Sequence, residues 1–202
     1  PGEDFNCRCW VEPVGDNQYA NQFLITPIND NPKKWTNKDF VDNYREGSGE
    51  GVTLSGTGYL ADVIEHYSET LGIYNRVNQQ VIDAAIAAGE GSFTYDFSNT
   101  YDFGGIFSGV LFSFGESTVS GIFIGDARKE KEYLVINGII TYDFYDEFAD
   151  PGQFVEIIDA IPGVDREDAT DLVGGFTDTE GKVYSITDRW QTKFNATVRL
   201  TE

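Results

Sequence analysis

The sequence predicts an α+β fold with an antiparallel sheet, because the spacing of its apolar residues changes once along the chain. Between residues 59 and 88 apolar side chains recur every three or four positions, as on one face of a helix. From residue 93 onwards they alternate with small or polar residues, which is the period of a half-buried strand. Helices followed by a run of strands are typical of an α+β domain.

Two helices are expected in the first of these regions. The first has an apolar stripe that ends at Gly72 and comprises Tyr59, Leu60, Val63, Ile64, Tyr67 and Leu71. The stripe of the second comprises Val77, Val81, Ile82, Ala85, Ile86 and Ala88. Gly89 follows it, and glycine suits the left-handed conformation at a helix end. Asn75 is the expected N-cap of the second helix.

Strands are expected over three runs rich in Phe, Tyr, Val and Ile: 93–97, 106–114 and 119–124. Asn137-Gly138 lies between two β-branched runs and predicts a two-residue type I′ hairpin, because both central residues of that turn need a positive φ. The cluster Arg-Lys-Glu-Lys at 128–131 indicates a charged turn between strands. Short helices after Pro151 and a final hairpin over 183–200 complete the expected order.

Residues 1–52 differ in composition from the rest of the chain. They are rich in Asn, Asp, Pro and Gly, which indicates a flexible linker with local structure at best. Their start, Pro-Gly-Glu-Asp-Phe-Asn-Cys-Arg-Cys, resembles the closing motif of phage Mu head-morphogenesis (MuF-type) domains, which often carry toxins at their C-termini. The resemblance implies that 1–52 are the tail of an upstream MuF-type domain plus a linker, and that 53–202 form a toxin domain.

The net charge of the chain argues against some classes of function. The chain carries 34 acidic and 14 basic residues, a formal net charge of −20. Such a surface repels nucleic acid phosphates, which argues against a nuclease or a transcription factor. The two cysteines, Cys7 and Cys9, are separated by one residue, so a disulfide between them would be strained.

Acidic side chains are concentrated at one expected strand end, 142–151. In an extended chain Asp143 and Tyr145 share one face, and Asp146 lies on the other. Asp and Glu are disfavoured in strands, so four acidic residues near one strand end require a structural or functional explanation. Clustered carboxylates such as Asp143 and Asp146 can hold Mg²⁺, and one carboxylate can act as general base for an attacking water. The alternative is a solvated strand end on a very acidic protein.

The run 136–146 resembles the hairpin and acidic motif of the colicin M-type enzymes. Asp143, Tyr145 and Asp146 occupy the motif's Asp, Tyr and Asp positions, and the likeness extends over roughly 59–202. It implies a strongly curved, half-barrel-like sheet with N-terminal helices packed against it. It also implies Mg²⁺-assisted hydrolysis of the lipid-linked pyrophosphate of lipid II, a reaction at phosphorus for which a metal and a carboxylate are suitable.

The chain departs from that family after the motif. The family's His-Arg pair falls near Gly152-Gln153 here, and the single histidine, His66, lies far upstream on an expected helix surface. Arg189 or Lys193, from the final hairpin, are candidates for the missing positive charge. The candidate catalytic residues are therefore Asp143, Tyr145, Asp146, Asp150 and Arg189.

The resemblance predicts an antibacterial effector, secreted or delivered by a secretion system, that acts in the periplasm of a target bacterium. Its expected partners are a lipid-linked peptidoglycan precursor, a cognate immunity protein and the membrane surface, with no nucleic acid. Two alternatives remain open. One is a binding or structural domain of a phage-derived particle, and the other is a membrane-damaging toxin that inserts the apolar runs 106–114 and 119–124.

Overall fold

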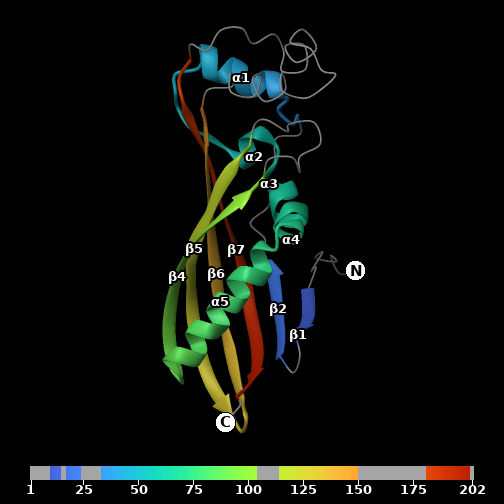
Figure 1. The fold of residues 1–202 in the computed structure, drawn as a ribbon, viewed down its shortest axis with the longest axis vertical. Coiled ribbons are helices and arrows are strands. Elements are labelled where there is room, and N and C mark those ends of the chain that lie inside the picture. Colours follow the sequence, from blue (N-terminus) through green and yellow to red (C-terminus); the bar gives the residue numbers. More distant parts are fainter. Residues whose placement is uncertain (1–9, 15–16, 24–32, 104–113, 150–180, 201–202) are drawn as a thin grey trace, which may run out of the picture.

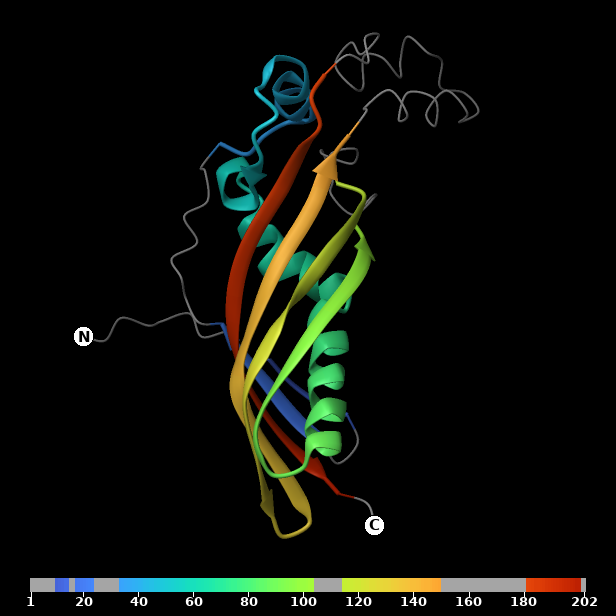
Figure 2. The same ribbon diagram turned by 90° about the vertical axis from the view of Figure 1, so that its left-hand side faces the viewer.

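The computed structural model describes residues 10–14, 17–23, 33–103, 114–149 and 181–200, which form one sheet with helices on one of its faces (Figures 1 and 2). The strands are β1 (Trp10–Val14), β2 (Asn17–Phe23), β3 (Val52–Thr53), β4 (Gly91–Asp102), β5 (Glu116–Glu130), β6 (Tyr133–Phe148) and β7 (Tyr184–Arg199). Their order is β1-β2-β7-β6-β5-β4, with β3 paired to β7. All pairs are antiparallel except the short parallel pair of β3 with β7. The sheet is curled and open (Figure 2), which confirms the predicted α+β class.

The helices are α1 (Asn37–Glu46), α2 (Leu54–Thr57), α3 (Leu60–Asp62), the π-helix η1 (Val63–Tyr67), α4 (Ser68–Thr70) and α5 (Ile73–Ala88). The first expected helix is thus α3, η1 and α4 in succession. The second is α5, and it ends before Gly89, whose φ of 76° confirms the expected stop. Asn75 is not its N-cap, because Gly72, with a φ of 66°, is the N-cap and the helix begins three residues earlier than expected, at Ile73.

Helix α5 crosses the face of the sheet that we call the inner face. Its apolar side Val77, Val81 and Ala85 is fully buried there. Gln80 and Asn99 exchange two amide hydrogen bonds, of 3.0 and 3.2 Å, which join α5 to β4. The inner face itself is built from buried strand residues, among them Phe97, Val119, Phe123, Ile136, Ile140, Tyr142, Phe144, Trp190 and Phe194. Each such side chain contributes about 1.5–3 kcal/mol to stability by leaving water.

The predicted hairpin at Asn137-Gly138 is wrong. Both residues lie inside β6, where Asn137 is opposite Asp126 of β5 and Asn195 of β7. The turn falls instead at Lys131-Glu132, where Lys131 has a φ of 59°. Of the charged turn expected over 128–131 only Lys131 lies in the turn, because β5 continues through Glu130. Gly138 serves packing, because a Cβ there would lie 2.4 Å from Cε2 of the Phe123 ring.

The final hairpin expected over 183–200 is also wrong, because β7 is one strand of 16 residues. Its buried and exposed positions alternate without interruption from Trp190 to Phe194, and nothing between them breaks the ladder to β6. Of the strand expected over 106–114, residues 106–113 lie outside the described residues, and Phe114 precedes β5 without belonging to a strand. The short helices expected after Pro151 also lie outside the described residues.

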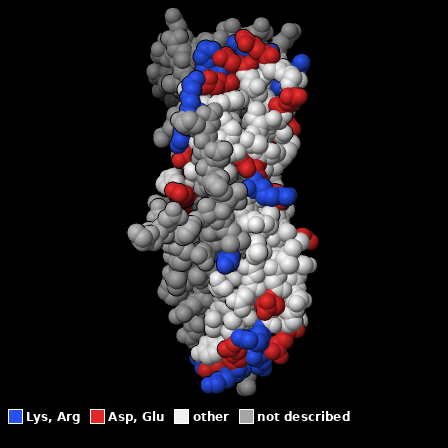
Figure 3. All heavy atoms as spheres, turned by 180° about the vertical axis from the view of Figure 1, so that it is seen from behind, with Lys and Arg blue, Asp and Glu red and all other residues white. Residues whose placement is uncertain are grey.

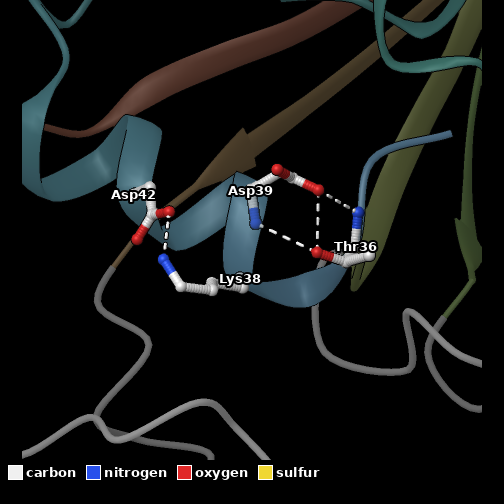
Figure 4. Close-up of polar contacts among 4 residues, drawn as sticks. All are labelled: Thr36, Lys38, Asp39 and Asp42. Carbon is white, nitrogen blue, oxygen red and sulfur yellow. Dashed lines mark hydrogen bonds and ion pairs between the residues drawn. The ribbon is translucent and has the colours of Figure 1, made fainter. Parts of the chain in front are cut away.

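Part of the segment expected to be a flexible linker belongs to the fold. Strand β2 pairs with β7 over six positions. Helix α1 begins with a capping box, in which the Thr36 hydroxyl accepts from the Asp39 amide and the Asp39 carboxylate accepts from the Thr36 amide (Figure 4). The linker interpretation relied on composition and overlooked this cap signal. The MuF-type origin of the segment and a boundary at 52 stay predictions.

Buried aromatic contacts fix α1 to the ends of the two longest strands. The Phe40 ring stacks on Phe148 with centroids 6.1 Å apart, and the Tyr184 hydroxyl donates to the Phe40 carbonyl at 2.8 Å. Tyr44 packs against Phe148 as well, with centroids 5.9 Å apart. Residues 37–46 therefore share the core of the sheet that carries the acidic motif.

Candidate functional site

The acidic motif lies near the end of β6, a central strand with β5 on one side and β7 on the other. Asp143 and Tyr145 point to the outer face of the sheet, and Asp146 points to the inner face, as the alternation predicted. Asp146 is buried, whereas Tyr145 is about half exposed. Asp150 lies outside the described residues. The structure therefore separates the two motif carboxylates by the thickness of the sheet.

Asp143 has Arg189 of β7 directly opposite it in the strand register. Nε of Arg189 donates to Oδ1 of Asp143 at 2.5 Å. The Asp143 carboxylate raises the pKa of Arg189 above its ordinary value, first through this hydrogen bond and then through its charge. Arg189 is 69% exposed and Asp143 38% exposed, so the pair is open to a ligand from solvent.

The pair provides complementary groups at one place on the outer face. A guanidinium has five N–H donors, and among the described residues the contact with Asp143 occupies only the Nε donor, which leaves the other four to bind an anion. A carboxylate can accept a proton from a water or hydroxyl group. Beside the pair, Gln191 donates to the Thr141 hydroxyl at 3.0 Å, and Tyr145 follows on the other side. This arrangement can bind a phosphate group and take up one proton.

Asp146 is held differently, within the core. Its carboxylate accepts from the Ser117 hydroxyl at 3.0 Å and from the Gly115 amide at 3.3 Å, both through Oδ2. Oδ1 accepts from the Glu147 amide at 2.8 Å. Burial raises the pKa of Asp146 above the ordinary value of an aspartate, and these hydrogen bonds oppose that rise. A buried carboxylate with three donors is suited to fixing the start of β5 against the end of β6.

A metal ion shared by Asp143 and Asp146 does not fit this geometry, because the two side chains lie on opposite faces of β6. Within the ranges that the structure describes, no three His, Cys, Asp or Glu side chains are grouped so as to hold a metal ion. Asp143 is also paired with a cation already. A Mg²⁺ ion held by one carboxylate and substrate phosphates stays a prediction from the resemblance.

Of the two candidate cations, the register selects Arg189. Lys193 is opposite Ile139, two positions further along the same face. His66 lies on η1, whose buried residues Val63, Ile64 and Tyr67 face the core, and its ring packs against Tyr67 with centroids 5.0 Å apart. Ser117, the partner of Asp146, was not identified from the sequence, in which no motif distinguishes it from other serines.

None of the helices built from the described residues is both long and apolar enough to span a membrane. Comparisons with protein-family models, with curated proteins and with solved structures found no match to this chain. The interpretation of the site therefore rests on its residues and their geometry.

Proposed function

We propose that the chain is an antibacterial effector that hydrolyses a lipid-linked peptidoglycan precursor in the periplasm of a target bacterium. The observation that supports this proposal best is the contact between Asp143 and Arg189. The acidic motif near the end of β6 lacks the basic partner of the colicin M-type pattern, and Arg189 of β7 brings a cation to Asp143 from another strand. A carboxylate beside an exposed guanidinium is suited to hydrolysis at phosphorus.

The residues take distinct roles in this proposal. Arg189 binds the phosphate oxygens with its free N–H groups and stabilises the charge that develops on them. Asp143 accepts the proton of the attacking water as the bond from phosphorus to the leaving oxygen breaks. Tyr145, on the same face, contacts the substrate next to the pair. Asp146 positions the strand from its other face, and Asp150 completes the motif.

The same proposal includes how the toxin is delivered, its immunity protein and its cofactor. The chain is secreted or delivered by a secretion system, and a cognate immunity protein protects the producing cell. Mg²⁺ is its proposed cofactor, bound mainly by substrate phosphates, because these are ligands that it prefers. The acidic chain favours an immunity protein with a basic contact surface.

Killing after expression in the periplasm of a sensitive bacterium tests this proposal. Asp143→Asn is expected to reduce killing by at least about a hundredfold, because it keeps the shape of the side chain and removes the proton acceptor. Arg189→Gln is expected to reduce it similarly. Asp126→Asn, an exposed acid on the same face of β5, is the matched control and should kill like the parent. Melting temperatures of all variants should stay close to that of the parent.

Two results would count against the enzyme. If Asp143→Asn kills as well as the parent at equal expression, the pair is an ordinary surface ion pair. If toxicity occurs only after cytoplasmic expression, the target is not exposed in the periplasm. Release of the lipid alcohol or phosphate from purified lipid-linked precursor, with and without Mg²⁺, then measures the reaction directly.

The alternative is a binding domain on a phage-derived particle, in which the exposed pair of Asp143 and Arg189 would be an ordinary surface ion pair. The alternative of a membrane-inserting hairpin has less support. Its second run, 119–124, lies in β5 between β4 and β6, and Val119 and Phe123 are fully buried in the core. Insertion would require both strand ladders of β5 to break.

A further inference from the structure

The pair Asn137-Gly138 predicted a turn, but it lies inside β6, with β5 on one side and β7 on the other. Asn137 is exposed and lies on the same face of the strand as Asp143. Asparagine followed by glycine is also a chemically reactive pair, because glycine has no side chain to shield its backbone nitrogen. The fold therefore holds a reactive pair at a place where the backbone is paired on both sides.

Packing requires the glycine of this pair. A Cβ at Gly138 would lie 2.4 Å from Cε2 of the Phe123 ring and 2.5 Å from the carbonyl oxygen of Ile124. The Phe123 side chain is fully buried, so its ring cannot move aside without a loss of packing in the core. Position 138 therefore excludes the larger residues that would shield the nitrogen.

The reaction is an attack within the pair. The Gly138 nitrogen loses its proton to hydroxide and attacks Cγ of Asn137, which closes a five-membered succinimide ring. The bond from Cγ to Nδ2 breaks, and the leaving nitrogen takes a proton from water and departs as ammonia. Water then opens the ring. Cleavage of the bond between Cγ and the nitrogen gives aspartate, whereas cleavage of the bond between the main-chain carbonyl and the nitrogen gives isoaspartate.

The ladders on both sides of β6 oppose this attack. Gly138 is paired with Gly125 of β5 and with Phe194 of β7. In an antiparallel sheet each backbone amide of a central strand donates to one neighbour or the other. The nitrogen reaches Cγ only if that hydrogen bond breaks and the backbone at Asn137 rotates out of the extended conformation. Both changes require a central strand to open, and such openings are among the rarest in a fold.

We infer that Asn137-Gly138 is a site of spontaneous deamidation, which the folded sheet keeps unreactive and which unfolding activates. Its isoaspartate product blocks the return to the fold, because it adds one main-chain carbon inside β6. The segments before and after that carbon pair with the same two strands, and their residues Ile136 and Ile140 are both fully buried. A shift of register on either side of it turns buried side chains toward solvent. This chemistry is independent of the proposed function.

The aspartate product changes the charge alone. Asp126 lies directly opposite position 137, so the new carboxylate meets a like charge. Figure 3 shows acidic and basic side chains gathered at the lower end of the molecule, which in Figure 1 is the end with the β5–β6 turn. Arg128 and Lys193 lie in the rows on either side of that of Asp126 and offset part of the repulsion. The fold therefore tolerates aspartate better than isoaspartate.

Incubation of the purified chain in mildly alkaline buffer, with and without a denaturing concentration of urea, tests the inference. Peptide mass spectrometry and enzymatic methylation of isoaspartate measure the products at position 137. Conversion is expected to be at least about a hundredfold faster in urea, because the folded chain reacts only through rare openings. After dilution from urea, the refolded fraction should fall as isoaspartate accumulates. Asn195, an exposed strand asparagine followed by alanine, should convert far more slowly in the same urea sample.

Two variants separate the chemistry from its consequence. Asn137→Gln cannot close the five-membered ring and should refold equally well before and after the incubation. Freshly prepared Asn137→Asp carries the new charge without the extra main-chain carbon and should refold like the fresh parent. Equal conversion in folded and unfolded chains, or full refolding of chains that contain isoaspartate, would overturn the inference. An equal loss of refolding in Asn137→Gln would do so as well, because the damage would then lie elsewhere.

Discussion

Asp146 is a carboxylate inside an aromatic core, between Phe144 and Phe148 on the inner face of β6. Burial raises its pKa above the ordinary value, and the nearby charge of Glu147 adds to this rise. The folded chain therefore retains a proton there over a pH range in which the unfolded chain has lost it. Stability from this group is present below the unfolded-state pKa and is lost as pH rises through the folded-state pKa.

This loss of stability with rising pH gives a measurable prediction for the variant Asp146→Asn, whose side chain cannot ionise. The free energy of unfolding of the variant minus that of the parent is expected to increase as pH rises from about 4 to about 7, starting near the ordinary pKa of aspartate. Urea unfolding at several pH values measures it. A difference that stays constant would mean that Asp146 titrates alike in the folded and unfolded chains.

Alternation along β6 was enough to predict that Asp143 and Tyr145 share one face and Asp146 the other. It was not enough to identify the cation. Asp143 and Arg189 are 46 residues apart in the chain, and their contact depends on the register between β6 and β7. That register is set by the buried side chains of both strands over their whole length, so a local motif does not contain it.

At the scale of the strand, the misplaced hairpin shows how packing overrode a local signal. Strands of about five or six residues are usual, whereas β6 has 16. Asn-Gly usually marks a turn, but here Gly138 and Gly125 make room for the ring of Phe123 beside the ladder. The sequence cannot distinguish a glycine needed for a turn from one needed for space without knowing which ring lies against it.

Threonine at two positions tests the turn assignment. Lys131→Thr is expected to lower the free energy of unfolding by about 1–2 kcal/mol, because a β-branched residue is disfavoured at the positive φ found there. Asn137→Thr should leave it unchanged or raise it by up to about 1 kcal/mol, because threonine favours an exposed strand position. Denaturant unfolding measures both. The opposite pattern would place the turn at Asn137-Gly138.

At the scale of the molecule, one sheet separates two environments. The inner face and the helices form the core, and the outer face carries the candidate site. The change of period near residue 90 predicted this α+β arrangement correctly. The N-terminal part of the fold was missed because its polar composition hides the few residues that α1 contributes to the core, Phe40, Val41 and Tyr44.

The boundary expected at 52/53 can be tested by truncation. A chain of 53–202 lacks α1, so Phe148 loses the rings of Phe40 and Tyr44 that pack on it, and the Tyr184 hydroxyl loses its acceptor, the Phe40 carbonyl. Burial of each of the three α1 core residues contributes about 1.5–3 kcal/mol, so their loss should cost about 4 kcal/mol or more. The total free energy of unfolding of a single domain is about 5–15 kcal/mol. We expect 53–202 to unfold with a much lower midpoint in urea or not to fold cooperatively.

A chain of 33–202 is the matched control, since it keeps α1 and its Thr36 cap; among the described elements it loses only β1 and β2, which join the sheet through the pairing of β2 with β7. The chain of 33–202 should unfold cooperatively and should have a higher free energy of unfolding than the chain of 53–202. The variant Phe40→Ala in the full chain separates packing from length, and it is expected to cost about 3–5 kcal/mol because the ring is fully buried. Equal stability of 33–202 and 53–202, together with a harmless Phe40→Ala, would show that α1 is an appendage. The domain would then begin near residue 53, where the composition of the chain changes.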